Sequence, residues 1–526
     1  MNSRILSVAL ILTACLAGLN AEAKTFRYST SGDILGLDPY TNNEGPNNAM
    51  KDNFYEGLIH RSHDLSLHPA LATDWKQTDA LTWRFNLRKG VKFHNGNAFT
   101  ADDVLISLER IRKPASALKF TVASIDRIDK IDDHTIDIIT RYPDPTLLLN
   151  LPMFWILDKE WLLANNGMDV EEGAVVSTYV NLNVNGTGPF MLEEWVPDTR
   201  TVLVPNPDWW GKPAHNLTKA IFQPIGNAST RVAALLSGDI DLMYPVPLQD
   251  IRRLESTPGM KVLQGPELRV VFLGFDQHRD ELLDLPGSGK NPFKDVRVRK
   301  AFYQAINIKA INRVVMRKAS KPTGAMIAEG INGFQPKMTE RYPYDPKAAR
   351  KLLSDAGYPE GFSVTLDCPN DRYVNDEAIC LSIIPMLKRI GIDVKLNAQT
   401  KSLHFEKIGR KQNYNTSFFM LGWTPGSYDA HNPLLQLLTL DGEGQGTWNS
   451  GRYTNPRIEA LTDEIAGEID TSKRNAMILE AYRIHHEDVG HIPLHQQTLA
   501  WGVGKRVKEV KQRPQNDVDL RYVIMQ

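Results

Sequence analysis

The strongest constraint on the fold is an alternation of strand and helix patterns over residues 362–396. Apolar and polar residues alternate over residues 362–366 and again over 392–396, as in strands with one buried face. The segment between them, residues 375–390, predicts a helix, although Pro385 should kink it. Because a strand, a helix and a further strand in succession are typical of a sheet covered by helices, we predict an α/β fold.

Two further segments carry clear signals of regular structure. Residues 81–88 alternate in the same way and predict a strand. Thr100 and Asp103 have the spacing of a capping box, which predicts the start of a helix that Pro114 ends. Residues 345–357 predict another helix, with a capping aspartate and a proline at its start and a glycine at its end.

The length and charge of the chain limit its possible partners. With 526 residues it is too long for a single core, so we predict about three structural units. Its 61 lysine and arginine residues balance 62 aspartate and glutamate residues, which gives no general attraction to nucleic acid or anionic membranes. We therefore expect recognition at a defined site and no nucleic-acid partner.

The N-terminus has the pattern of a secretory signal peptide. Arg4 precedes the almost wholly apolar residues 5–19, and Ala21 and Ala23 provide the small residues of a cleavage site. We predict that residues 1–23 are removed and that the mature chain is exported.

The three cysteines have different expected fates. Cys15 ends a short sequence that resembles the box before a lipid-modified cysteine, but the apolar run continues to a better cleavage site, so we favour cleavage over a lipid anchor. Cys368 and Cys380 remain in the mature chain, and in an oxidising compartment this even pair can form a disulfide. Two free buried thiols are the alternative.

Motifs of known enzymes are incomplete in this chain. His486 and Glu487 begin a zinc-protease pattern, but position 490 is glycine where the second histidine should stand. The glycines near Lys290 lack the remaining residues of a phosphate-binding loop, and no nucleophile elbow occurs. We therefore expect no enzyme activity, no metal site and no cofactor.

Motifs in order along the mature chain resemble the extracellular solute-binding proteins of family 5, which include dipeptide-, oligopeptide-, glutathione- and nickel-binding proteins of ABC importers. The match covers essentially the whole mature chain. Its most specific segments are PALATDW (69–75), LTWRFNLRKGVKFHNG (81–96), FTADDV (99–104), GTGPF (186–190), NPDWWG (206–211), STRVAALLSGDID (229–241) and PFKDVRVRKA (292–301).

The resemblance implies a two-lobed periplasmic-binding-protein fold of the class with an extra inserted domain. The first lobe would combine residues 24–68, 187–274 and 491–526, the inserted domain would be 69–186, and the second lobe would be 275–490. A hinge between the lobes would lie near residues 271–275 and 492–497. A ligand in the cleft between the lobes would stabilise the closed state.

The resemblance also implies ligand-binding residues in the second lobe. Arg372 follows a predicted strand at the position where dipeptide-binding relatives hold the ligand carboxylate; pairing with Asp371 or Asp376 is the alternative. Relatives place an aspartate three residues after the tryptophan that corresponds to Trp423 to bind the ligand amine, and Gly426 stands there. Residues in the same loop offer substitutes: Asp429 as a possible amine anchor, and Trp423 and Tyr428 as stacking residues.

Position in the family fold implies further candidates in the first lobe. The loop 38–47 should face the cleft, as should five residues for which a structural role is the alternative: Tyr55, Glu56, Asn185, Gly186 and Thr187.

The function implied is a periplasmic, monomeric substrate-binding protein that delivers a small molecule to ABC permease subunits in the inner membrane. We expect a short peptide or amino-acid conjugate as the ligand. The alternatives are an opine-like compound, a sugar or a metal complex, an extracytoplasmic hydrolase of peptides or glycosides, and a chaperone or sensor partner.

Overall fold

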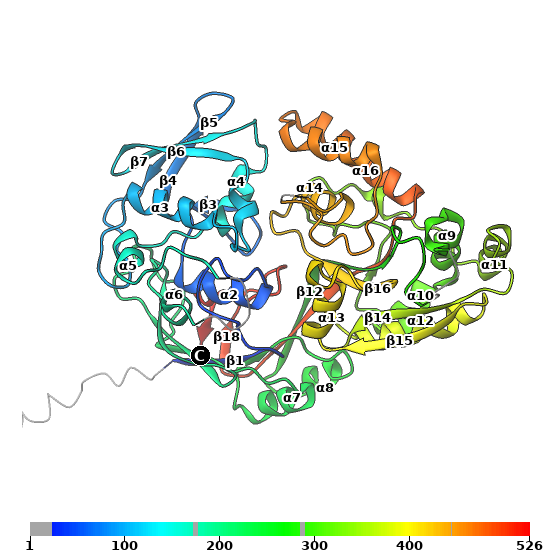
Figure 1. The fold of residues 1–526 in the computed structure, drawn as a ribbon. Helices are drawn as coiled ribbons and strands as arrows, with labels where there is room; N and C mark the ends of the chain where they lie inside the picture. The colour runs from blue at the N-terminus through cyan, green and yellow to red at the C-terminus, as the bar shows by residue number, and fades with distance from the viewer. Residues whose placement is uncertain (1–23, 172–176, 285–289, 443) are drawn as a thin grey trace, which may run out of the picture.

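The computed structural model describes residues 24–171, 177–284, 290–442 and 444–526. The predicted signal peptide, with Cys15, and most of the loop at 285–292 lie outside these residues. Figure 1 shows two lobes side by side, joined at the base by long strands, with a smaller domain above the first lobe. The two-lobed α/β architecture is the one predicted from the sequence. None of the helices in the described part of the chain is long and apolar enough to span a membrane.

One mixed sheet runs through both lobes. In it β12 and β17 separate three strands of the second lobe from five strands of the first. In spatial order the path is β15 (Asp393–Gln399), β14 (Ser363–Pro369), β16 (Phe418–Trp423), β12 (Lys261–Phe275), β17 (His491–Val503), β11 (Leu242–Met243), β1 (Thr25–Ser29), β10 (Lys219–Phe222), β9 (Arg200–Pro205) and β8 (Phe190–Val196).

The two lobes are connected by the antiparallel pair β12 and β17. The first part of β12, Lys261 to Pro266, pairs with the end of β17, whereas Val270 to Gly274 pairs with its beginning. The register shifts between Pro266 and Val270. This interruption lies a few residues before the segment 271–275 that the resemblance suggested as the hinge, and it changes the direction in which residues 267–269 point.

The inserted domain has a sheet of its own. Four antiparallel strands follow the order β4 (Ala72–Gln77), β5 (Thr82–Leu87), β7 (Thr135–Thr140) and β6 (Ile125–Asp132). Helix α3 (Ala101–Ile111) begins with the predicted capping box, in which the Thr100 backbone N donates to Asp103 Oδ2 at 2.8 Å. The strand and helix predicted here are confirmed.

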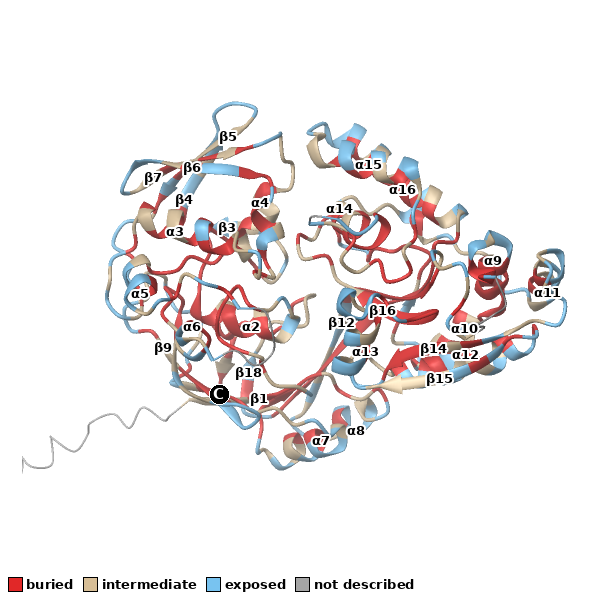
Figure 2. Cartoon of the chain, viewed as in Figure 1, coloured by how far each residue is buried: buried red, intermediate tan, exposed pale blue. Residues whose placement is uncertain are grey.

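The second lobe contains the predicted succession of strands and helices. Helix α11 (Pro346–Asp355) precedes β14, and α12 (Asp376–Lys388) connects β14 to its parallel neighbour β15, with Pro385 inside the helix. The buried residues of these elements form one core beneath the sheet, as the red segments of Figure 2 show. Further helices complete the lobe: α9 (Val296–Ala305), α10 (Ile308–Val314), α13 (Lys401–Ile408), α15 (Pro456–Gly467) and α16 (Thr471–Glu487).

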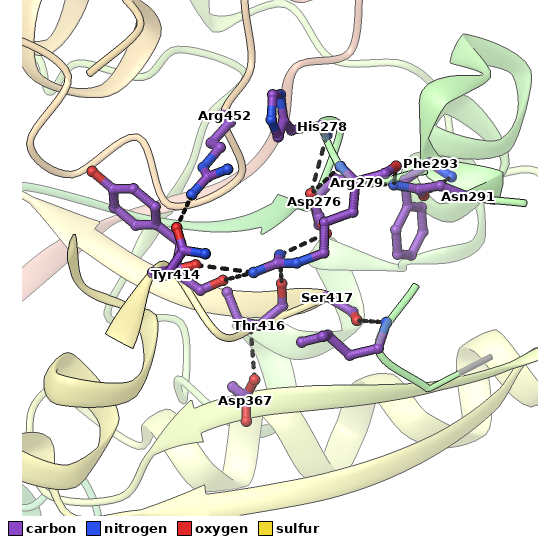
Figure 3. Close-up of polar contacts among 12 residues, drawn as sticks. Asp276, His278, Arg279, Asn291, Phe293, Asp367, Tyr414, Thr416, Ser417 and Arg452 are labelled. Carbon is purple, nitrogen blue, oxygen red and sulfur yellow. Dashed lines mark hydrogen bonds and ion pairs between the residues drawn. The ribbon is translucent and has the colours of Figure 1, made fainter. Parts of the chain in front are cut away.

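Arg279 belongs to a polar network that connects three chain segments of the second lobe (Figure 3). Its Nη1 lies 2.8 Å from Asp276 Oδ2, and its Nη2 donates to the carbonyls of Asn413 and Tyr414, each at 2.9 Å. Thr416 Oγ1 extends the network to Asp367 Oδ2 at 2.6 Å. These contacts hold this part of the second lobe together.

Candidate functional site

The register break in β12 places a charged pair at the crossing between the lobes. Glu267 and Arg269 flank Leu268, and Arg269 Nε donates to Glu267 Oε1 at 2.8 Å. Gln497 of β17 donates to the other carboxylate oxygen of Glu267. Burial lowers the pKa of Arg269, but Glu267, Tyr373 and Glu44 together outweigh this effect and the net change is upward. Arg269 therefore remains charged, and the Glu267 carboxylate balances its charge and holds it in place.

Arg372 lies beside this pair, in the loop between β14 and α12. The backbone N atoms of Arg372 and Tyr373 both donate to Asp376 Oδ2 at 2.9 Å, and Val374 N donates to Gln497 Oε1 at 3.0 Å. A disulfide between Cys368 and Cys380 closes the same loop, as the even cysteine pair allowed. The loop backbone is thus held firmly, which fixes the point from which the Arg372 side chain extends.

No side-chain hydrogen bond or ion pair of Arg372 is found within the described part of the chain. The guanidinium lies 5.5 Å from the ring centroid of Tyr373, and its Nε is buried without a hydrogen-bond partner among the described residues. Burial, and next the positive charge of Arg269, lower the pKa of Arg372. Since an arginine in proteins stays charged, the side chain is available to bind an anion at this place.

A side chain of the first lobe reaches the same region. Glu44 precedes helix α2 (Gly45–Phe54), and its Oε1 lies 2.7 Å from Lys401 Nζ, at the start of α13 in the second lobe. The negative charge of Glu44 also acts on Arg269 and Arg372. The lobes are therefore in contact here, and charges of both signs meet between them. In Figure 1, α2 and α13 lie on facing sides of the two lobes.

The loop that follows β16 also touches the other half of the molecule. A Cβ at Gly426 would lie 3.3 Å from the Phe120 ring and 3.8 Å from Met153 Sδ, both in the inserted domain. Tyr428 packs under the guanidinium of Arg61, 4.4 Å from the ring centroid, and burial raises its pKa to about 12. Trp423 donates from Nε1 to Asn432 at 2.9 Å and is half-buried.

Asp429 is turned away from this face. It has no exposed surface, and its carboxylate accepts from both Nη atoms of Arg474 at 2.7 and 3.0 Å. Asn332 Nδ2 and the backbone N of His431 fill its remaining positions at 2.6 and 2.8 Å. In this structure Asp429 is a structural ion-pair partner, which differs from the amine-binding role expected from the sequence.

The first-lobe candidates gather at the junction with the inserted domain. Glu56 is buried and accepts from Thr187 Oγ1 at 3.0 Å and from the indoles of Trp209 and Trp210 at 3.2 and 2.8 Å. Burial raises its pKa. These contacts use both carboxylate oxygens, so Glu56 connects segments of its own lobe.

Three further candidates near Glu56 are also packed against, or hydrogen-bonded to, other segments of the protein. Asn185 bonds to Asp158 and to the backbone of Asn95, at 2.8 and 3.1 Å. Gly186 exchanges hydrogen bonds with His94, and a Cβ there would clash with Phe54 O at 2.1 Å. Tyr55 packs against Gly186, and its buried hydroxyl has no partner within the described chain.

Comparison with known proteins defines the class. The profile described as bacterial extracellular solute-binding proteins, family 5 middle, matches residues 66–445. The chain therefore belongs to family 5 of the bacterial extracellular solute-binding proteins.

Individual relatives resemble the chain over almost its full length. Heme-binding protein A of Haemophilus influenzae is 28% identical over 545 residues, covering 97% of this chain and 96% of that protein. The dipeptide-binding protein of Escherichia coli K12 is 27% identical over 537 residues, covering 96% and 95%. A solved structure, the ABC transporter-associated periplasmic binding protein DppA from Helicobacter pylori in complex with peptide STSA, has a TM-score of 0.81 and 27% identity, covering 95% and 97%.

Proposed function

We propose that this protein is the periplasmic substrate-binding component of an ABC importer, that it carries no enzyme activity, and that its ligand is a short peptide or amino-acid conjugate. Two of the similar proteins are described as dipeptide-binding or as a complex with a peptide, and one as heme-binding. The mature chain would start at Lys24 and act as a monomer. After closure it would dock on permease subunits in the inner membrane.

The observation that carries this proposal is the guanidinium of Arg372, whose buried Nε has no hydrogen-bond partner among the described residues and whose side chain is half-buried. A ligand carboxylate would supply the acceptor that the chain lacks, through a charge-assisted hydrogen bond. Trp423 and Tyr428 would form walls of the ligand site, with the backbone at Gly426 between them. We assign Tyr55, Glu56, Asn185, Gly186 and Thr187 to the frame of the first lobe, behind the ligand.

Ligand retention and thermal shift test the proposal. Protein purified gently from its host would be denatured and the released small molecules identified by mass spectrometry. The same compounds, added at 100 times their dissociation constant, should stabilise the protein by about 2.7 kcal/mol. Recovery of cleaved products instead of intact ligand would indicate a hydrolase, and no response to any peptide or conjugate would contradict the ligand class.

Arg372→Gln tests the assignment of the carboxylate site. We expect affinity for a retained carboxylate ligand to fall at least about 30-fold, which corresponds to about 2 kcal/mol, because a buried charge pair is lost. Arg350→Gln is the matched control, since Arg350 is exposed on α11 in the same lobe. Equal affinity of both variants would show that the carboxylate binds elsewhere.

A further inference from the structure

Glu44 occupies a helix-capping position without capping the helix. It is the residue before α2, where a side-chain oxygen commonly accepts from a backbone N of the first turn. No such hydrogen bond forms; the carboxylate instead crosses to Lys401 in the second lobe. The side chain is only 18% exposed in this contact. The Glu44 side chain therefore contacts the second lobe and does not cap its own helix.

The two oxygens of this carboxylate are in different situations. Oε1 lies 2.7 Å from Lys401 Nζ, whereas Oε2 is buried and has no hydrogen-bond partner in the described ranges. A carboxylate has about four acceptor positions, and a buried oxygen without a donor costs free energy. One more donor is needed at Oε2.

Two cations on which the charge of Glu44 acts, Arg269 and Lys51, already have other partners. Arg269 is paired with Glu267, and Lys51 donates to the carbonyls of Pro39 and Asn42 at 3.3 and 2.9 Å. The buried amide of Asn47, in the first turn of α2, also leaves its Nδ2 without a partner among the residues described. Two polar atoms of the first lobe, Glu44 Oε2 and Asn47 Nδ2, thus lack partners among the described residues, and the charge of Glu44 acts on Arg372 in the second lobe.

We propose that Glu44 binds the primary ammonium group of the ligand and so supplies the negative charge that Gly426 does not. The ligand would be zwitterionic and derived from amino acids, with its carboxylate at Arg372 and its free amine at Glu44 Oε2. This inference rests on the proposed function and narrows its ligand class to molecules with an unblocked amine. Lys401 acts as a positioning residue that holds the carboxylate from the opposite lobe.

A competition experiment separates amine binding from a purely structural interlobe contact. The mature protein is incubated with an equimolar mixture of Ala-X dipeptides and their Nα-acetylated counterparts, washed, and the bound peptides are quantified by mass spectrometry. We expect the wild type to prefer free amines at least about tenfold, as expected for one charge-assisted contact. In Glu44→Gln this preference should disappear, while Glu44→Asp should keep part of it.

Lys401→Gln is the matched control. It removes the same interlobe ion pair but leaves the Glu44 carboxylate, so retention of both peptide sets should fall together and the preference for free amines should remain. A wild type without preference, or a Glu44→Gln variant that keeps it, would overturn the inference and leave the proposed function intact. Retention of neither set by the wild type would overturn both. Circular dichroism of each variant confirms that it is folded.

Discussion

Replacing Asp429 with alanine should lower the free energy of unfolding of the second lobe without removing a ligand contact. The carboxylate is fully buried and holds Arg474, whose side chain is only 5% exposed. Without Asp429 this guanidinium stays in the core with no counter-charge. The variant also leaves Asn332 and the backbone N of His431 without their acceptor.

The size of the effect follows from the burial of the pair. Removing one partner of a buried ion pair destabilises a protein by about 3–5 kcal/mol. With a urea m-value of about 3 kcal/mol per M, the unfolding midpoint should fall by about 1 M or more. Far-UV circular dichroism followed through a urea titration measures this midpoint. The double variant Asp429→Leu/Arg474→Met, which removes both charges, should regain most of the loss.

The matched control is Glu487→Ala, which breaks an exposed pair with Arg483 on α16. That change should cost less than about 1 kcal/mol. If Asp429→Ala had an unchanged urea midpoint but lost affinity for a retained ligand, the structural reasoning would be refuted and the amine-binding role expected from the sequence would be restored.

Two further predictions concern stability. Reducing the Cys368–Cys380 disulfide should lower the free energy of unfolding by about 3 kcal/mol for a loop of this length, measured in urea with and without dithiothreitol; an unchanged midpoint would contradict it. Burial lowers the pKa of His495 to about 3, so the unfolded chain binds more protons below pH 6.5 and stability is lost as pH falls toward 3. Between pH 7 and pH 4, the free energy of unfolding of His495→Asn should fall by about 3 kcal/mol less than that of the wild type. An equal fall in both proteins would show that His495 is already charged in the folded state.

Local sequence patterns predicted the elements of the fold well. The strands and helices over 81–111 and 345–396 are confirmed because their signals, alternation and capping, arise within a few consecutive residues. Arg372 is also placed correctly after its strand. That its Nε has no partner in the described ranges could not be foreseen, because its surroundings include Arg269 and Glu44, which are distant in the sequence.

The loop 38–47, which contains Glu44, and Asp429 were named as candidates, but their contacts were not predicted, for the same reason. Glu44 and Lys401 are 357 positions apart, and Asp429 meets Arg474 only after α16 packs on its loop. One local signal was present: Gly265 and Pro266 lie inside the strand β12, and a proline inside a strand is typical of a bulge. The register shift falls between Pro266 and Val270, the segment that carries Glu267 and Arg269.

The paired strands between the lobes also limit how the two lobes can move relative to each other when a ligand binds. Since β12 and β17 are hydrogen-bonded to each other on both sides of the register break, the lobes are joined by a ribbon and not by two independent tethers. The paired register resists sliding of one strand past the other, so we expect the lobes to approach each other mainly by bending of this ribbon. Cargo molecules of different size would then bring the outer surfaces of the lobes along a similar path, and a transporter that contacts both lobes would detect occupancy without reading the identity of the cargo.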